Sequence, residues 1–149
     1  MKNKILTLLI LLCSMSFALK AQDDDRADRF RAQRVSFLTE RMKLNSAEAQ
    51  RFWPVYNEYS EKRDKINQEK IKLNRYVAQF ANTVSDKEAN DLSIKFLTLE
   101  KQEVQLREDY HKKFTSIVSA RKVLLLYQGE TQFKAYLLKQ IRGNSDNKK

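Results

Sequence analysis

Residues 44–59 read LNSAEAQRFWPVYNEY and begin the longest amphipathic run of the chain. This stretch also holds the only tryptophan and the only proline of the sequence, Trp53 and Pro54. Asn45 is a favourable N-cap, because its side-chain oxygen can accept a hydrogen bond from a free amide in the first helical turn. Glu48 follows three residues later, where its carboxylate can bond back to the Asn45 amide as in a capping box. The stretch therefore predicts a helix that starts at residue 46.

Apolar residues at helical spacing extend this helix to about residue 80. The stripe consists of Ala49, Phe52, Tyr56, Tyr59, Arg63, Ile66, Lys70, Leu73, Val77 and Phe80. Arg63 and Lys70 interrupt it, but their long stems can pack while their charges reach water. Pro54 lies inside the helix and removes the hydrogen bond to the Gln50 carbonyl, so we expect a bend near residues 50–54. We interpret Trp53 and Pro54 as a packed bend and not as a binding site.

Three further helices are predicted, over residues 26–42, 86–117 and from 120 to about 141. Ser85 and Glu88 form a second capping-box match, and Ser119 is the expected N-cap of the last helix. The stripe of the third helix consists of Ala89, Leu92, Phe96, Leu99, Glu103, Leu106, Tyr110, Phe114 and Ile117. With two glycines and one proline, the chain has little turn chemistry for a β-sheet. We expect an all-α fold of four helices, followed by a disordered basic tail at 143–149.

The lengths of the two central helices indicate how they pack. A helix of about 35 residues is about 52 Å long, whereas a compact globule of about 128 residues has a radius of gyration of about 14 Å. Residues 46–80 and 86–117 should therefore pair as a long antiparallel hairpin, which gives the domain an elongated form. The last helix has a wider apolar face than one hairpin can bury, so we expect a symmetric homodimer.

The first 21 residues are typical of a secretory signal peptide. Lys2 and Lys4 precede an apolar run that is shorter than a membrane-spanning helix requires, although an uncleaved anchor is the alternative. We expect cleavage after Ala21, with Ala18 as the other possible site. The only cysteine, Cys13, lies inside this segment, so the mature chain at 22–149 would have no thiol and no disulfide. The predicted location is the periplasm.

The charge of the chain is strongly basic. Removal of residues 1–21 takes away three lysines and no acidic residue, which lowers the formal net charge from +10 to +7. In a cytosolic protein this surplus would suggest nucleic acid, but export argues against that partner. The remaining partners are anionic membrane surfaces, acidic polymers and negatively charged unfolded chains.

The sequence has no recognisable catalytic or metal-binding constellation. Its single histidine, His111, lies among charged helix residues, and the mature chain would lack cysteine. Triads that need histidine with cysteine or serine, and sites with several histidines, are not expected. We therefore expect neither an enzyme nor a cofactor.

Two short segments resemble the Leu-Thr-x-x-Gln motifs of the Spy/CpxP-type periplasmic proteins, each of which opens a helix. The first segment, LNSAE at 44–48, begins with Leu44 and has asparagine for threonine and glutamate for glutamine. The second, VSARK at 118–122, begins with Val118 and Ser119 and has lysine in place of glutamine. Residues 52–59 and 122–138 are similar to a branch labelled sensor of ECF-type sigma factor. The resemblance covers roughly residues 30–142.

This resemblance implies a cradle-shaped antiparallel homodimer and one of two functions. One is ATP-independent binding of unfolded envelope proteins, and the other is regulation of an envelope-stress or sigma-factor pathway through a specific membrane partner. A third hypothesis, an envelope-surface protein in weak contact with anionic lipid, depends on the basic charge alone. The candidate contact residues for a client or partner are Tyr59, Arg63, Lys70, Lys72, Arg75 and Tyr76.

Overall fold

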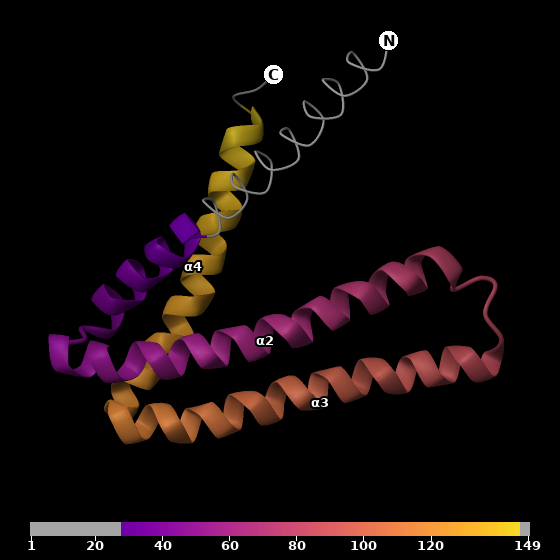
Figure 1. The fold of residues 1–149 in the computed structure, drawn as a ribbon. Coiled ribbons are helices and arrows are strands. Elements are labelled where there is room, and N and C mark those ends of the chain that lie inside the picture. Colours follow the sequence, from indigo (N-terminus) through magenta and orange to yellow (C-terminus); the bar gives the residue numbers. More distant parts are fainter. Residues whose placement is uncertain (1–27, 147–149) are drawn as a thin grey trace, which may run out of the picture. The chain divides into compact units, whose positions relative to one another are not determined.

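The computed structural model describes residues 28–146, and this part of the chain is all-α (Figure 1). It contains a helix at residues 28–42, then α2 (Ser46–Phe80), α3 (Asp86–Ile117) and α4 (Ala120–Asp146). The described residues form two compact units, one made of residues 28–42 and 126–146 and the other of residues 43–125. The predicted signal peptide, its cleavage after Ala21 and the end of the tail at 147–149 lie outside the described residues.

The predicted boundaries of the two central helices, 46–80 and 86–117, are confirmed. The predicted end of the last helix is wrong, because α4 continues past residue 141 to Asp146. Residues 143–146 are therefore helical and do not belong to a disordered tail. Glycine and asparagine are weak helix formers, but no proline follows residue 141 to stop the backbone ladder.

The start of α2 has the capping box that its sequence predicts. The Asn45 side chain accepts a hydrogen bond from the Glu48 amide, and the Glu48 carboxylate accepts one from the Asn45 amide, both at 2.9 Å. Just before the cap, Lys43 has a φ of 51°, in the left-handed region. A left-handed residue commonly ends a helix, and here it follows residues 28–42 and precedes the start of α2 by three residues.

The start of α3 is capped on one side only. Ser85 accepts a hydrogen bond from the Glu88 amide at 3.3 Å, as predicted. The Glu88 carboxylate, which we expected to bond back to the Ser85 amide, instead accepts a hydrogen bond from the Tyr76 hydroxyl at 2.7 Å. This contact ties the end of α2 to the start of α3 across the connecting loop.

Helices α2 and α3 pair as the predicted antiparallel hairpin (Figure 1). Glu58 of α2 forms an ion pair with Lys113 of α3 at 3.6 Å. Farther along the hairpin, the Lys70 ammonium donates to the Glu103 carboxylate. Lys70 and Glu103 are polar residues within largely apolar stripes, and they face each other. This register lets the apolar positions of the two stripes meet.

The best-packed part of the hairpin is an aromatic cluster near the start of α2 and the end of α3. Its members, each 0–2% exposed, are Phe52, Tyr56, Tyr59, Tyr110 and Phe114. Their ring centroids lie 5.2–6.2 Å apart, within the range of favourable aromatic pairs. The cluster therefore holds the hairpin together at this end.

The unit made of residues 28–42 and 126–146 packs the first of these helices against the later part of α4. Leu38 and Met42 are fully buried. Gly129 is also buried, and a Cβ atom placed on it would lie 2.8 Å from Cδ2 of Leu38. At the edge of this contact, Arg41 donates two hydrogen bonds to the Gln132 side chain, at 2.8 and 2.6 Å. Gly129 thus marks a close approach of the two helices in this unit.

Candidate binding surface of the helical hairpin

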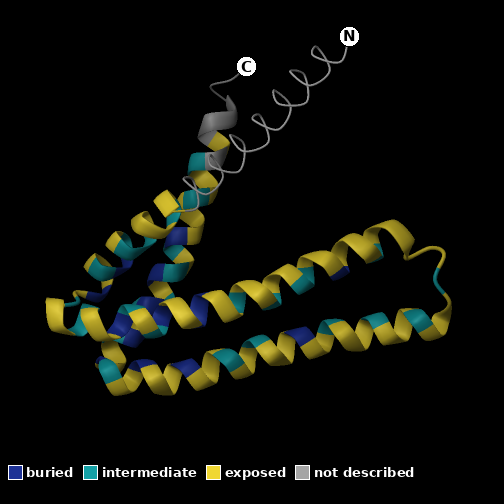
Figure 2. Cartoon of the chain, viewed as in Figure 1, coloured by how far each residue is buried: buried dark blue, intermediate teal, exposed yellow. Residues whose placement is uncertain are grey.

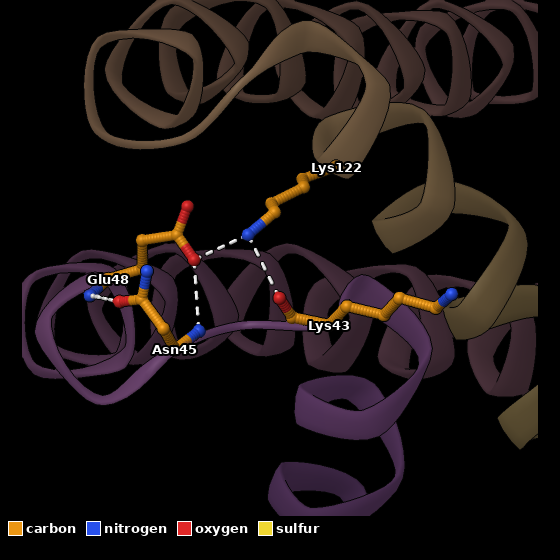
Figure 3. A network of polar contacts seen from close by, with 4 residues as sticks. All are labelled: Lys43, Asn45, Glu48 and Lys122. Atoms are coloured by element: carbon orange, nitrogen blue, oxygen red, sulfur yellow. Dashed lines mark hydrogen bonds and ion pairs between the residues drawn. The ribbon is translucent and has the colours of Figure 1, made fainter.

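The two motif segments meet in one polar network around Lys122 (Figure 3). The Lys122 ammonium donates to the Glu48 carboxylate and to the Lys43 carbonyl, the latter at 2.9 Å. Glu48 at the same time completes the capping box of Asn45. The Lys122 hydrogen bond, followed by that of the Asn45 amide, lowers the pKa of Glu48. Lysine at the expected glutamine position therefore joins the second motif segment to the first.

The other motif residues lie mainly in the packed interior. Phe52 and Tyr56 are 0% and 1% exposed, and Val118 is 4% exposed. Trp53 is half-buried, and its ring stands edge-on at 5.3 Å from the rings of both Phe52 and Tyr56. Pro54 is exposed, and α2 continues through it as one helix. The interpretation of Trp53 as a packing residue agrees with these contacts, whereas the bend at Pro54 stays a prediction.

The structure removes Tyr59 from the candidate contact surface. Its side chain is 2% exposed, because it packs on Tyr110 and Phe114 in the aromatic cluster. The Arg63 guanidinium lies over the Tyr59 ring at 5.3 Å from its centroid. Lys70 is engaged by Glu103. These three residues serve the packing of the hairpin. For Tyr59 this was predictable, because it belongs to the apolar stripe of the helix.

The other three candidates, Lys72, Arg75 and Tyr76, do lie on the surface of α2. Their spacing places them on one side of the helix. Lys72 pairs with Glu69 at 2.8 Å but keeps 68% of its side chain exposed. Tyr76 is 40% exposed and its ring lies 4.9 Å from that of Phe80, which is also exposed. This side of α2 thus combines basic groups with two aromatic rings.

A second exposed apolar surface lies on α3 and was missed from the sequence. Ile94, Leu97 and Val104 are 52%, 66% and 57% exposed. At about 100° per residue they lie roughly 150° around the helix from the stripe that faces α2. The sequence signal was present, because these residues follow each other at intervals of three and seven. The predominance of the main stripe concealed it. We call these three residues the outer α3 face.

The hairpin is nearly neutral, although the chain is strongly basic. Helices α2 and α3 together contain 13 basic and 12 acidic residues. The surplus positive charge of the chain therefore resides mostly outside them.

Glu58 has the most strongly shifted carboxyl group of the hairpin. Its carboxylate lies 2.8 Å from the Lys62 ammonium and 3.6 Å from that of Lys113, and both ammonium groups lie over the Tyr110 ring. Chiefly the Lys62 hydrogen bond, then the Tyr110 hydroxyl, lower the pKa of Glu58 to about 2. The buried Tyr110 hydroxyl nevertheless has no partner at hydrogen-bonding geometry among the described residues, so we assign the shift mainly to Lys62.

Acid should destabilise the hairpin through Glu58. Because its pKa is lower in the folded chain than the ordinary 4.5, its contribution to stability is complete above about pH 4.5 and is lost as the pH falls towards 2. Urea unfolding at several pH values should show the free energy of unfolding decreasing over this range. Glu58→Gln should make the decrease shallower, since glutamine does not titrate. An identical pH dependence in both proteins would contradict this assignment.

Among residues 28–146, no group of three or more histidine, cysteine, aspartate or glutamate side chains is placed to hold a metal ion. No helix in this part of the chain is long and apolar enough to cross a membrane. The geometry defines an all-α protein whose long hairpin exposes apolar and charged side chains together. No family model, curated protein or solved structure matches the chain.

Proposed function

We propose that this protein is an ATP-independent, chaperone-like binder of unfolded or misfolded envelope proteins. The observation that carries the proposal is the outer α3 face, where Ile94, Leu97 and Val104 are each more than half exposed on one side of a long helix. Exposed apolar residues that cluster on a surface commonly mark interaction sites. Here they are accompanied by charged side chains such as Lys101, which keep the surface soluble.

The form of this surface favours weak binding at several points. The three apolar side chains are spread along about two to three turns of α3 and do not form a deep pocket. The tyrosine and phenylalanine at the end of α2, Tyr76 and Phe80, provide a second place for apolar contact. An extended client can touch both places while each contact remains weak. Release then needs no energy source, which agrees with the absence of a phosphate-binding glycine loop from the sequence.

Charge would act mainly at long range in this proposal. The mature chain would carry +7, whereas the helices of the hairpin are almost balanced, with 13 basic and 12 acidic residues. An acidic unfolded client would be attracted to the protein as a whole. Lys72 and Arg75, beside Tyr76, are the exposed basic groups best placed for direct contact. Binding should therefore weaken with salt but persist through apolar contact.

We also propose export to the periplasm and a relationship to the Spy/CpxP-type proteins. The basic start and apolar run at residues 2–12 support export. The contact of Lys122 with Glu48 supports the relationship, because it brings the two motif-like segments together at the starts of two helices.

An aggregation assay tests the proposed function. The mature chain, at several-fold molar excess and low salt, should suppress light scattering from a chemically denatured acidic client. Leu97→Glu with Val104→Glu should reduce this suppression by at least about threefold, because burying a new carboxylate against an apolar client is unfavourable. The matched control, Gln68→Glu with Gln102→Glu, adds the same charge at exposed positions outside the outer α3 face. It should retain suppression.

Two outcomes would contradict this function. Wild-type protein without effect on any client would exclude general chaperone activity, and equal loss in both double variants would show that only charge matters. If crosslinking in intact cells then recovers one specific membrane partner, the regulatory sensor becomes the better proposal. Sedimentation of the wild-type sample tests the homodimer that we also propose.

A further inference from the structure

Packing along the hairpin is uneven. At the end near the start of α2, the aromatic cluster is 0–2% exposed. Towards the loop at 81–85, the only buried apolar side chains in α2 and α3 are Leu73 and Leu99, at 4% and 6%. Phe80, the last stripe residue of α2, is 37% exposed. Figure 2 shows the same change, with dark blue residues concentrated at one end of the hairpin and sparse towards the loop.

The Lys70–Glu103 ion pair stands between these two regions. It occupies a position in both stripes where an apolar pair would otherwise pack, and the two side chains remain 25% and 32% exposed. Removing two charges from water costs free energy that their attraction repays only in part. The pair thus fixes the register of the helices but contributes less to their cohesion than two packed apolar side chains would.

The loop end of the hairpin has little else to hold it. Its polar contact between the helices is the hydrogen bond from Tyr76 to Glu88, whose residues are exposed and half-buried, respectively. The Ser85 cap at the start of α3 is long, at 3.3 Å. Two helices that bury one narrow stripe between them have modest stability, because most helical stability in proteins comes from tertiary packing.

We infer that the distal arms of the hairpin, residues 70–80 and 86–103, separate in the native protein without unfolding of the aromatic cluster. Such subglobal opening is expected where few apolar side chains are buried. Opening would expose the inner stripe, including Leu73 and Leu99, to water or to a bound chain. Its use in client capture rests on the proposed function, whereas the opening itself does not.

Hydrogen exchange of the full mature chain, read by mass spectrometry, tests this inference. Amides in the distal arms should exchange at least about tenfold faster than those in residues 50–60 and 107–116, because separated arms lose the packing that holds their helical hydrogen bonds. Equal protection along both helices would overturn the inference. No client is present in this measurement, so its result does not depend on the proposed function.

Substitution of the ion pair provides a second test. Lys70→Met with Glu103→Leu should slow exchange in the distal arms by at least about threefold and leave the aromatic cluster unchanged, since apolar pairs often replace partly buried ion pairs favourably. Glu103→Leu alone leaves Lys70 without its partner and should speed exchange in the same arms. Lys72→Met, at an exposed pair in the same arm, is the control and should change little. Unaltered exchange in both Glu103 variants would refute the role of the pair.

A client experiment separates the opening from its use. A permanently unfolded, acidic polypeptide, reduced and carboxymethylated, should bind the Lys70→Met/Glu103→Leu variant at least about threefold more weakly than wild type if capture needs open arms. Slower exchange with unchanged binding would overturn the link between opening and capture. Absence of binding to wild type would overturn the proposed function and, with it, that link, while the exchange result would still decide the opening.

Discussion

Replacing Phe114 by alanine is expected to lower the free energy of unfolding by about 3–5 kcal/mol. Phe114 is 1% exposed, and its ring lies 5.2 Å from that of Phe52, 6.2 Å from that of Tyr56 and 5.6 Å from that of Tyr59. Alanine would leave a cavity among large, rigid rings that cannot close around it. The aromatic pairs would also be lost. Urea denaturation followed by circular dichroism measures the change.

Phe80→Ala provides the matched control for this substitution. The same side chain is removed, but Phe80 is 37% exposed and lies near the loop end of the hairpin. Its loss should cost about 1 kcal/mol, because only part of the ring leaves water on folding. If both variants lost equal stability, the aromatic cluster would not be the principal core of the hairpin.

Much of the hairpin was predictable because its determinants are local or periodic. The Asn45–Glu48 capping box needs only residues three apart, and it forms as expected. The stripes of α2 and α3 also follow from spacing, and their antiparallel pairing follows from helix length. The meeting of Lys70 with Glu103 is then a consequence of register, although no single helix reveals it.

Other contacts depend on three-dimensional neighbours and could not be predicted in this way. Glu88 matched the capping-box spacing, but the Tyr76 hydroxyl, supplied by another helix, takes its carboxylate. Lys122 looked like a departure from a motif, yet it bonds to Glu48 at a separation of 74 residues. Spacing places such residues on a helix but does not identify which element will lie opposite.

In the candidate site, too, some residues were placed correctly from the sequence and others were not. Lys72, Arg75 and Tyr76 are on the surface as expected of candidate contacts, whereas Tyr59 is buried. Tyrosine suits both a core and a binding surface, so residue type alone did not decide which tyrosines are buried and which are exposed. The outer α3 face was missed because a helix with one strong apolar stripe is normally polar on its other side. Its departure from that rule is the main reason to propose binding there.

The second large expected effect concerns Gly129, a position whose importance the sequence did not indicate. Gly129→Leu is expected to lower the free energy of unfolding by about 2–3 kcal/mol, because extra methylene groups would be forced into a packed contact. Even a Cβ atom would lie 2.8 Å from Cδ2 of Leu38 and 3.7 Å from Cβ of Arg41. A leucine side chain cannot fit without moving the helix of residues 28–42 away from α4.

Gly129→Ala separates helix propensity from crowding at this position. Alanine favours a helix over glycine by about 1 kcal/mol. The only contact tighter than ordinary packing is with the end of the Leu38 side chain, which can adjust its rotamer. The two effects should nearly cancel, so urea denaturation of this variant should give a stability close to that of wild type. The pair of variants would contradict a close helix approach at Gly129 if leucine, like alanine, left the free energy of unfolding unchanged.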